Sequence, residues 1–355
     1  MAATPKELVR PEILALSAYH VHDARGMVKL DAMENPYRLS ARLRREAGRL
    51  AEDAELNRYP DPSGGALKHV LRSAMGIPED AAILLGNGSD EIIQIIAMGL
   101  ARSGAAIVAP EPSFVMYRMI ATFCGMRYVG VPLRKDFSLD LDATLAAIER
   151  ERPAVVFIAF PNNPTGNLFP AAALERILTR TSGLVVIDEA YHAFARASFL
   201  NRVGEFPNLV VMRTLSKLGL AGLRLGFLVG RPEWLNEFEK LRLPYNVNVL
   251  TQAIAARVLE DSAALADQAE MIVRARNELI DSMSALASIR VYPSDANFVL
   301  FRAPDGPRVF AALKQRGVLI RNLDGSHPLL ANCLRVTVGS ADDNDAFLAA
   351  LRASL

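Results

Sequence analysis

Three polar side chains with catalytic potential each follow an apolar run of the kind that forms a buried strand. They are Lys217, Asp188 and Asn163. A lysine amine can form an imine with an aldehyde, and an aspartate can hold the proton on a ring nitrogen. Because ligands gather at the carboxyl ends of parallel strands, we expect these side chains to lie together. This combination is what a protein needs to bind pyridoxal phosphate.

Lys217 is the candidate for the reactive amine. It follows Ser216 and precedes a glycine-rich stretch that ends at Arg224. The amine must be partly neutral to react, and burial or a nearby cation lowers the pKa of a lysine. Arg224 can supply that cation beside a cofactor phosphate. A lysine taken alone is more often an exposed loop residue, so this interpretation depends on its neighbours.

The partners expected for a cofactor ring are Asp188, Tyr191 and Asn163. A carboxylate at the end of an apolar strand is costly to bury without a partner, and a protonated pyridine nitrogen is a suitable one. Tyr191 and Asn163 can hydrogen-bond the ring oxygen from two sides. A helix cap or a core salt bridge explains Asp188 equally well. A packed tyrosine and a turn asparagine remain the alternatives for the other two.

The segment 86–91 leads into a helical pattern and contains two glycines, Ser89 and Asp90. Backbone N–H groups at a helix N-terminus suit a phosphate, although a plain helix cap also accounts for the serine and the aspartate. The segment is neither a Walker loop nor a dinucleotide-binding turn. Phe114 can stack on a planar ring, and an ordinary core aromatic is the alternative.

Two arginines are candidates for binding an anionic substrate. Arg335 lies inside a strand-like run, and Arg321 follows another. A fixed guanidinium recognises a carboxylate or a phosphate in bidentate fashion. The alternative for each is an arginine whose head group reaches solvent. No metal centre is expected, because His20 and His22 lack a third ligand at a suitable spacing and His192 is interpreted as structural.

The composition limits the class of protein. The chain has 355 residues, of which 51% are hydrophobic, and a net charge of +1. This balance argues against a general nucleic-acid or membrane-surface role. Cys124 and Cys333 have no metal-binding spacing and are expected to be free thiols in a reducing compartment. We expect a cytoplasmic protein, because the N-terminus lacks an apolar signal core and no run is long enough to span a bilayer.

The order of apolar runs predicts an α/β fold. Strands are expected at 83–85, 106–109, 155–160, 184–187, 209–212 and 225–229, with helical segments between them. Such runs are typical of a mainly parallel sheet buried on both faces. Helical stretches at 249–286 and strands at 297–302 and 334–338 indicate a smaller α+β domain. The expected division is an N-terminal arm at 1–37, a large domain at 38–245 and a small domain at 246–355.

The motifs, taken in order, resemble the fold-type I pyridoxal-phosphate aminotransferases, and within that group the histidinol-phosphate aminotransferases. The resemblance covers essentially the whole chain and implies a seven-stranded sheet in the large domain. The motifs that carry it are residues 29–37, 57–61, 86–91, 162–166, 186–191, 216–217, 219–224 and 334–339.

The resemblance also implies a role for each candidate residue. Lys217 carries the imine and moves the proton, Asp188 pairs with the ring nitrogen, and Asn163 and Tyr191 hold the ring oxygen. The residues that match a phosphate site are Ser89, Asp90, Ser216 and Arg224. Phe114 matches the ring-stacking position. Tyr59 matches a residue that reaches the phosphate of a neighbouring subunit, which implies a homodimer. The residues that match a substrate site are Tyr19, Asn35, Arg321 and Arg335.

The activity implied by the resemblance is transfer of the amino group of glutamate to imidazole-acetol phosphate, giving 2-oxoglutarate and histidinol phosphate. An aromatic or broad-range aminotransferase and a threonine-phosphate decarboxylase are the alternatives within the fold. A transcription regulator would need an added DNA-binding domain, for which there is no room before Tyr37. A nicotinamide-dependent oxidoreductase would need a glycine fingerprint that is missing.

The chain departs from the family pattern in three places. The loop after Lys217 is one residue shorter than in many relatives, which affects where Arg224 lies. Phe114 stands where tyrosine is frequent, so stacking is kept and a hydroxyl is lost. Met33 replaces a polar side chain within the motif 31–35.

Overall fold

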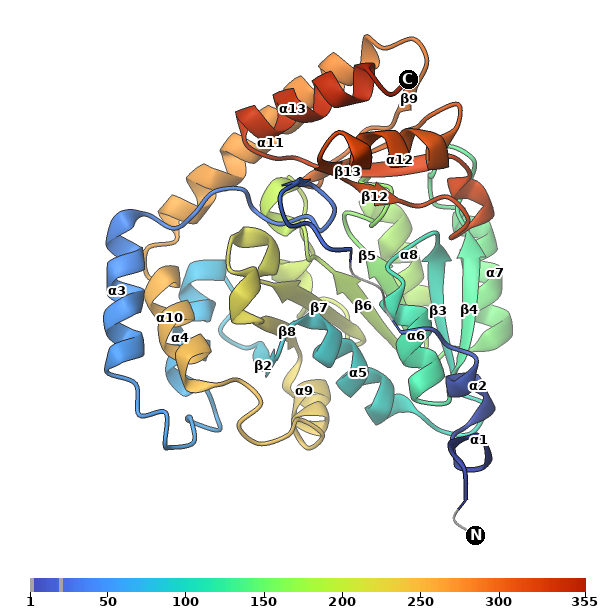
Figure 1. Cartoon of the computed structure of the whole chain (residues 1–355). Helices are drawn as coiled ribbons and strands as arrows, with labels where there is room; N and C mark the ends of the chain where they lie inside the picture. The colour runs from blue at the N-terminus through green and yellow to red at the C-terminus, as the bar shows by residue number, and fades with distance from the viewer. Residues whose placement is uncertain (1–2, 19–21) are drawn as a thin grey trace.

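The computed structural model describes residues 3–18 and 22–355, and its largest sheet within them has seven strands (Figure 1). The strand order is β2-β8-β7-β6-β5-β3-β4. Only β8 runs antiparallel to its neighbours, β2 and β7, and the remaining pairs are parallel. The predicted α/β fold with a mainly parallel sheet is therefore confirmed. The strands are β2 (Ala82–Gly86), β3 (Ala106–Glu111), β4 (Arg127–Pro132), β5 (Val155–Ala159), β6 (Leu184–Asp188), β7 (Leu209–Thr214) and β8 (Gly226–Gly230).

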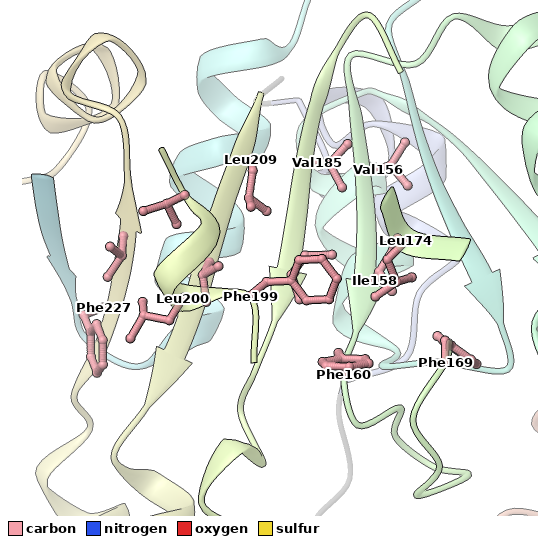
Figure 2. Close-up of a cluster of buried hydrophobic side chains, with 14 of the residues drawn as sticks. Val156, Ile158, Phe160, Phe169, Leu174, Val185, Phe199, Leu200, Leu209 and Phe227 are labelled. Carbon is pink, nitrogen blue, oxygen red and sulfur yellow. The ribbon is translucent and has the colours of Figure 1, made fainter. Parts of the chain in front are cut away.

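Successive residues of the central strands enter two different cores, because side chains alternate between the faces of a sheet. Figure 2 shows one core, in which Val156, Ile158 and Val185 pack with Leu174 and Phe199. The helices that contribute to this core are α4 (Gly65–Met75), α7 (Leu141–Glu151), α8 (Ala171–Arg180) and α10 (Val249–Leu259). The helices on the opposite face are α5 (Ser89–Leu100), α6 (Met116–Phe123) and α9 (Pro232–Glu239). Cover on both faces explains why the strands are continuously apolar.

A smaller antiparallel sheet lies in the C-terminal third, with the order β12-β13-β10-β9. A third core packs it against three helices, which Figure 1 shows gathered at one end of the molecule. The N-terminal arm joins this part of the chain, because β1 pairs with β11 in parallel. The elements are β1 (Val28–Lys29), β9 (Arg290–Val291), β10 (Phe298–Arg302), β11 (Val318–Leu319), β12 (Arg321–Asn322), β13 (Cys333–Thr337), α11 (Ala263–Ser284), α12 (Gly306–Gln315) and α13 (Ala341–Arg352).

The structure refines several predicted elements. The helical stretches predicted at 249–286 are the two helices α10 and α11, and α10 packs against α3 (Ala41–Glu52) and α4. Strand β4 was not predicted, because it is an edge strand whose residues are mostly half-exposed. Two short helices, α1 (Pro5–Leu8) and α2 (Pro11–Leu14), lie in the arm. The domain boundaries at 37 and 245 remain predictions. No described helix is both long and apolar enough to cross a membrane.

Candidate active site

Most of the predicted site residues surround one cavity of about 100 Å³ at the carboxyl edge of the large sheet. They lie at or just after the ends of β2, β3, β5, β6 and β7, except for Arg224, which lies two residues before the start of β8. This convergence follows from the parallel arrangement, which brings the ends of these strands to one edge. We call this space the inner cavity. The predicted residues on its wall are Ser89, Asp90, Phe114, Asn163, Asp188, Tyr191, Ser216, Lys217 and Arg224.

Asp188 forms the acidic end of the inner cavity. It is the last residue of β6, and only 5% of it is exposed. The Tyr117 hydroxyl donates to its Oδ2 at 2.6 Å, and the Ala190 N–H donates to its Oδ1 at 3.0 Å. Burial raises the pKa of Asp188 to about 6, and these two hydrogen bonds oppose that rise. A buried carboxylate of this kind is well matched to a cationic ring nitrogen.

Tyr117 is a site residue that the sequence interpretation missed. Its side chain is completely buried, stacked on the Phe157 ring with 4.8 Å between centroids. Burial and the negative charge of Asp188 raise its pKa, so the phenol stays protonated and remains a donor. Tyr117 lies three residues after Phe114 at the start of α6, within an apolar pattern that predicts only packing. No signal in the sequence separates it from an ordinary core tyrosine.

Lys217 lies in a single turn of 3-10 helix just after β7, and it is half-buried. Its Nζ donates to the Ala32 carbonyl at 3.1 Å. Burial lowers the pKa of Lys217 to about 8, with the positive charge of Arg335 as the next cause. About a tenth of the amine is therefore neutral at pH 7, far more than for an ordinary lysine, and a nucleophile or proton carrier needs this neutral form.

The opposite end of the inner cavity is built to bind an anion. Ser89 is the first residue of α5, and Gly88 before it has a φ of +83°. A Cβ on Gly88 would lie 2.6 Å from Nη2 of Arg224, so glycine is needed for this approach. Arg224 donates to the Ser216 hydroxyl at 3.3 Å and lies 3.7 Å from Asp90. Helix N–H groups beside a guanidinium are a suitable site for a phosphate.

These three parts of the wall fit pyridoxal phosphate. The Lys217 amine suits its aldehyde, the Asp188 carboxylate suits its ring nitrogen, and the α5 terminus with Arg224 suits its phosphate. The shortened loop after Lys217 still places Arg224 on the cavity wall.

A second, larger cavity of about 450 Å³ adjoins the first, and Met33, Phe114 and Asn163 line both. We call it the outer cavity. Arg321 and Arg335 lie on its wall and are direct partners across the antiparallel pair β12–β13. Like charges opposite each other in a sheet repel, and a bound anion would relieve the repulsion. This register is the strongest structural indication of an anionic substrate.

Arg335 also connects the two cavities. Only 7% of it is exposed, so its head group does not reach freely into solvent as one alternative would require. Its Nη1 donates to Asn163 Oδ1 at 2.5 Å, and its Nη2 donates to the Asp31 carbonyl at 3.0 Å. The guanidinium is therefore fixed in place before any ligand binds.

Met33, the departure from the family pattern, has a left-handed backbone with a φ of +53°. The backbone is held on both sides: its N–H donates to Thr337 Oγ1 at 2.9 Å, and its carbonyl accepts from Asn297 at 3.0 Å. Left-handed conformations are unfavourable for a methionine and concentrate at functional sites. The side chain lies between the two cavities.

Two predicted residues, among those that the structure describes, line neither cavity. Tyr59 is 80% exposed and stacks on Tyr245 with 4.4 Å between ring centroids. Asn35 donates to the Leu218 carbonyl at 3.3 Å and so supports the loop after the lysine. Tyr19 lies outside the described residues. Contact of Tyr59 with a neighbouring subunit remains a prediction.

Glu189 and Arg213 form a buried ion pair next to the inner cavity, and the sequence interpretation also missed it. Glu189 is fully buried, and its Oε2 accepts from Arg213 Nη2 at 2.8 Å. Its other oxygen accepts from the Phe199 N–H at 2.5 Å. Burial lowers the pKa of His192 to about 3, and the ring donates through Nδ1 to the Glu189 carbonyl at 3.1 Å. This ring is neutral and packed, as the structural interpretation of His192 anticipated.

Comparison with known proteins gives a consistent result. The family described as aminotransferase class I and II matches residues 25–351. The chain is 54% identical to a histidinol-phosphate aminotransferase from Chromobacterium violaceum over 352 residues, which is 99% of each chain. It is also 54% identical to histidinol-phosphate aminotransferase 2 from Nitrosococcus oceani, over 97% of this chain and 96% of that one. The histidinol-phosphate aminotransferase from Sinorhizobium meliloti, solved in complex with pyridoxal 5'-phosphate, superposes with a TM-score of 0.84. It shares 25% identity, and the match covers 98% of both chains.

Proposed function

Because the chain belongs to the aminotransferase class I and II family, we propose that it is a pyridoxal-phosphate-dependent aminotransferase whose product is histidinol phosphate. The amino group comes from glutamate and passes to imidazole-acetol phosphate in two half-reactions at one site. The 54% identity to relatives with this activity supports the substrate. Within the molecule, the observation that carries the proposal is the pair of arginines facing each other in the outer cavity.

The residues of the inner cavity would hold the cofactor. When bound, pyridoxal phosphate supplies an aldehyde that carries the amino group and a ring that withdraws electrons. Asp188 would keep the ring nitrogen protonated, and Tyr117 and Ala190 fix the two oxygens of Asp188 by hydrogen bonds. Asn163 and Tyr191, on the same wall, would bind the ring oxygen, and Phe114 would cover the ring. Ser89, Ser216 and Arg224 would bind the phosphate, and Asp90 would act through Arg224, because a carboxylate would repel a phosphate.

Lys217 serves as the proton carrier. With a pKa of about 8, the amine can accept a proton from a substrate carbon and return it at another carbon. The Ala32 carbonyl holds Nζ at 3.1 Å and so restricts where the amine waits. The positive charge of Arg335 favours the neutral amine, which links substrate binding to the basicity of the lysine.

The outer cavity would bind the amino donor, glutamate, and then the amino acceptor, imidazole-acetol phosphate. Arg321 and Arg335 can form a guanidinium fork with the phosphate of histidinol phosphate or with a carboxylate of glutamate. Tyr19 and Asn35 belong to this proposal by resemblance. A homodimer is also part of it, because Tyr59 and Tyr245 form an exposed aromatic pair that a partner subunit would cover.

The cofactor assignment is tested by absorption spectroscopy of the purified protein with added pyridoxal phosphate. Wild type should develop an absorption band of the bound cofactor, and borohydride should fix the cofactor on Lys217, as located by mass spectrometry. Lys217→Ala should lose the covalent link, whereas Lys240→Ala, at an exposed site, should keep it. Reductive trapping at another lysine would overturn the assignment.

The substrate is tested by steady-state assays with glutamate and a series of oxo acids. Imidazole-acetol phosphate should be preferred over aromatic oxo acids by kcat/KM. Release of carbon dioxide from threonine phosphate would support the decarboxylase alternative instead.

A further inference from the structure

The outer cavity contains a second charged pair that the proposed mechanism does not use, Glu111 with Arg118. We propose that this pair recognises the end of each substrate that is remote from Arg335. Arg118 would bind the second carboxylate of glutamate, and Glu111 would accept a hydrogen bond from the imidazole N–H of histidinol phosphate. The inference rests on the proposed function, since it assigns the two substrates of that reaction to one subsite.

The pair is placed by two neighbouring elements. Glu111 is the last residue of β3, and Arg118 lies in α6, the helix that follows. Nη2 of Arg118 lies 2.7 Å from Oε1 and 2.8 Å from Oε2 of Glu111. Both side chains line the outer cavity together with Arg321 and Arg335. The cavity therefore carries charged groups of both signs on one continuous wall.

A glycine in the neighbouring strand leaves the space that the Glu111 side chain occupies. Gly130 of β4 pairs with Ala109, two residues before Glu111, and a Cβ on Gly130 would lie 1.9 Å from Oε2 of Glu111. Any larger residue at 130 would displace the carboxylate. The side chain of Glu111 is only 17% exposed, which makes a charged partner necessary. Burial and the charge of Glu111 raise the pKa of Tyr128, which keeps this neighbouring phenol neutral.

Arg118 can take on another partner without leaving Glu111. Its side chain is 57% exposed, and its guanidinium lies 4.5 Å from the centre of the Tyr128 ring. Both contacts to Glu111 are made by Nη2, so the donors on Nη1 and Nε are not used by that carboxylate. An incoming carboxylate can therefore accept a charge-assisted hydrogen bond from Nη1 while Nη2 stays on Glu111.

The two substrates make opposite demands at this subsite. The remote group of glutamate is an anion that needs donors, whereas a neutral imidazole or an imidazolium offers an N–H that needs an acceptor. A wall of one sign would leave one of these groups buried without a partner, at a cost in affinity. A pair that presents a carboxylate and a guanidinium together satisfies both.

His327, on the same wall, does not duplicate this function. Its Nδ1 accepts from the Leu329 N–H at 3.1 Å, which leaves the proton on Nε2 and the ring neutral. Burial lowers its pKa, in keeping with the neutral form. Discrimination by charge therefore falls to Glu111 and Arg118.

The experiment compares KM for the two substrates in single variants of the holoenzyme. Arg118→Gln should raise KM for glutamate and 2-oxoglutarate about tenfold and leave KM for histidinol phosphate within about twofold, because a bond to a charged group is lost in one case only. Arg118→Lys should recover part of the loss. Glu111→Gln should show the reverse selectivity, with about a tenfold rise for histidinol phosphate alone.

Arg127→Gln is a matched control, since Arg127 pairs with Glu151 at 3.0 Å and has nearly the same exposure, 55%, but lies outside both cavities. Its KM values should equal those of wild type. Equal rises for both substrates in both cavity variants, or no rise in either, would overturn the inference. A wild-type enzyme that does not transaminate these substrates would instead overturn the proposed function.

Discussion

The inner and outer cavities differ in how deeply some of their charged side chains are buried and in how fully those side chains are hydrogen-bonded. At the acidic end of the inner cavity, Asp188 is almost fully buried and bonded to Tyr117 and Ala190. In the outer cavity, the side chain of Arg118 is more than half exposed and keeps donors that Glu111 does not use. The contrast matches the proposed ligands. A cofactor that stays bound can be met by fixed groups. Substrates that replace each other share an anion that the fixed Arg335 can bind, but their remote ends differ and need a group able to change partners.

The exposed fractions of two ion pairs show the same difference. The side chains of Glu189 and Arg213 are 0% and 7% exposed, whereas those of Glu111 and Arg118 are 17% and 57% exposed. Losing one member of a buried pair leaves an uncompensated buried charge, whereas Arg118 is exposed enough to be solvated when Glu111 is lost. The Glu189–Arg213 pair should therefore contribute to the stability of the fold, and the Glu111–Arg118 pair to the choice of substrate.

Glu189→Gln should destabilise the fold by about 3 to 5 kcal/mol, because the Arg213 charge remains buried without its carboxylate. Denaturant unfolding of the cofactor-free protein would measure the change. The exposed control Arg127→Gln should cost less than about 1 kcal/mol. Similar losses in the two variants would mean that burial does not distinguish these pairs.

Asp188→Asn should lower kcat at least a hundredfold, because an amide cannot hold the positive charge on the ring nitrogen, and about 3 kcal/mol corresponds to that factor. The amide keeps the shape of the side chain, so the unfolding midpoint should change little by comparison. Steady-state kinetics with saturating cofactor would measure the effect. A loss below tenfold would show that the ring nitrogen does not depend on this residue.

Arg335→Lys should raise KM for both glutamate and histidinol phosphate by roughly ten- to thirtyfold, or about 2 kcal/mol. A lysine keeps the charge, but it cannot hold Asn163 and the Asp31 carbonyl while binding a substrate anion. This effect on both substrates is the counterpart of the selective effects expected at Arg118 and Glu111. A rise for one substrate alone would place Arg335 in the selective subsite instead.

The sequence was sufficient for the parts of the site that depend on local pattern. Apolar runs end at Asp188 and just before Lys217, and the parallel sheet brings these ends together. The helix that starts at Ser89 was likewise visible as glycines before an apolar period. In these cases strand and helix ends fix the position of the side chain.

The parts that were missed depend on contacts between distant segments. Tyr117 donates a hydrogen bond to Asp188, which lies 71 positions later in the sequence, and no local pattern near either residue predicts this bond. Arg321 and Arg335 were each predicted, but their register across β12–β13 is a property of the folded sheet. Contact of Tyr59 with a second subunit, which the resemblance implies, stays a prediction. Edge strand β4 carries no continuous apolar signal.

Tyr117→Phe should weaken cofactor binding about tenfold, because the hydrogen bond to a charged carboxylate contributes about 1.5 kcal/mol. The Tyr117 bond lowers the pKa of Asp188, so its loss should move the acidic limb of cofactor affinity to higher pH. Fluorescence titration across pH 5 to pH 8 would measure both effects. Tyr292→Phe removes another buried phenol away from the inner cavity and should leave the limb in place.

Lys217→Met should stabilise the cofactor-free protein at pH 7 by about 1 kcal/mol. The folded-state pKa of Lys217 is about 8, below its ordinary 10.5, so between these values the folded protein binds fewer protons than the unfolded chain. Wild-type stability therefore rises with pH across this window, and the full penalty for charging the lysine is present below pH 8. The shift alone corresponds to about 3 kcal/mol, which we reduce because the side chain is half-buried and the Ala32 carbonyl loses its donor.

Methionine carries no charge, so the advantage of the variant should shrink as the pH approaches 10.5. Urea unfolding at pH 7 and pH 10 would measure it, with Lys240→Met as a control at a lysine whose side chain is 66% exposed. An equal gain at both pH values would trace the effect to packing and not to the charge. A gain that disappears at pH 10 would show that the inner cavity holds its amine in an unfavourable charged state until the cofactor arrives. That is the behaviour expected of a group kept fixed for one permanent ligand, and Arg118, exposed and able to change partners, should not show it.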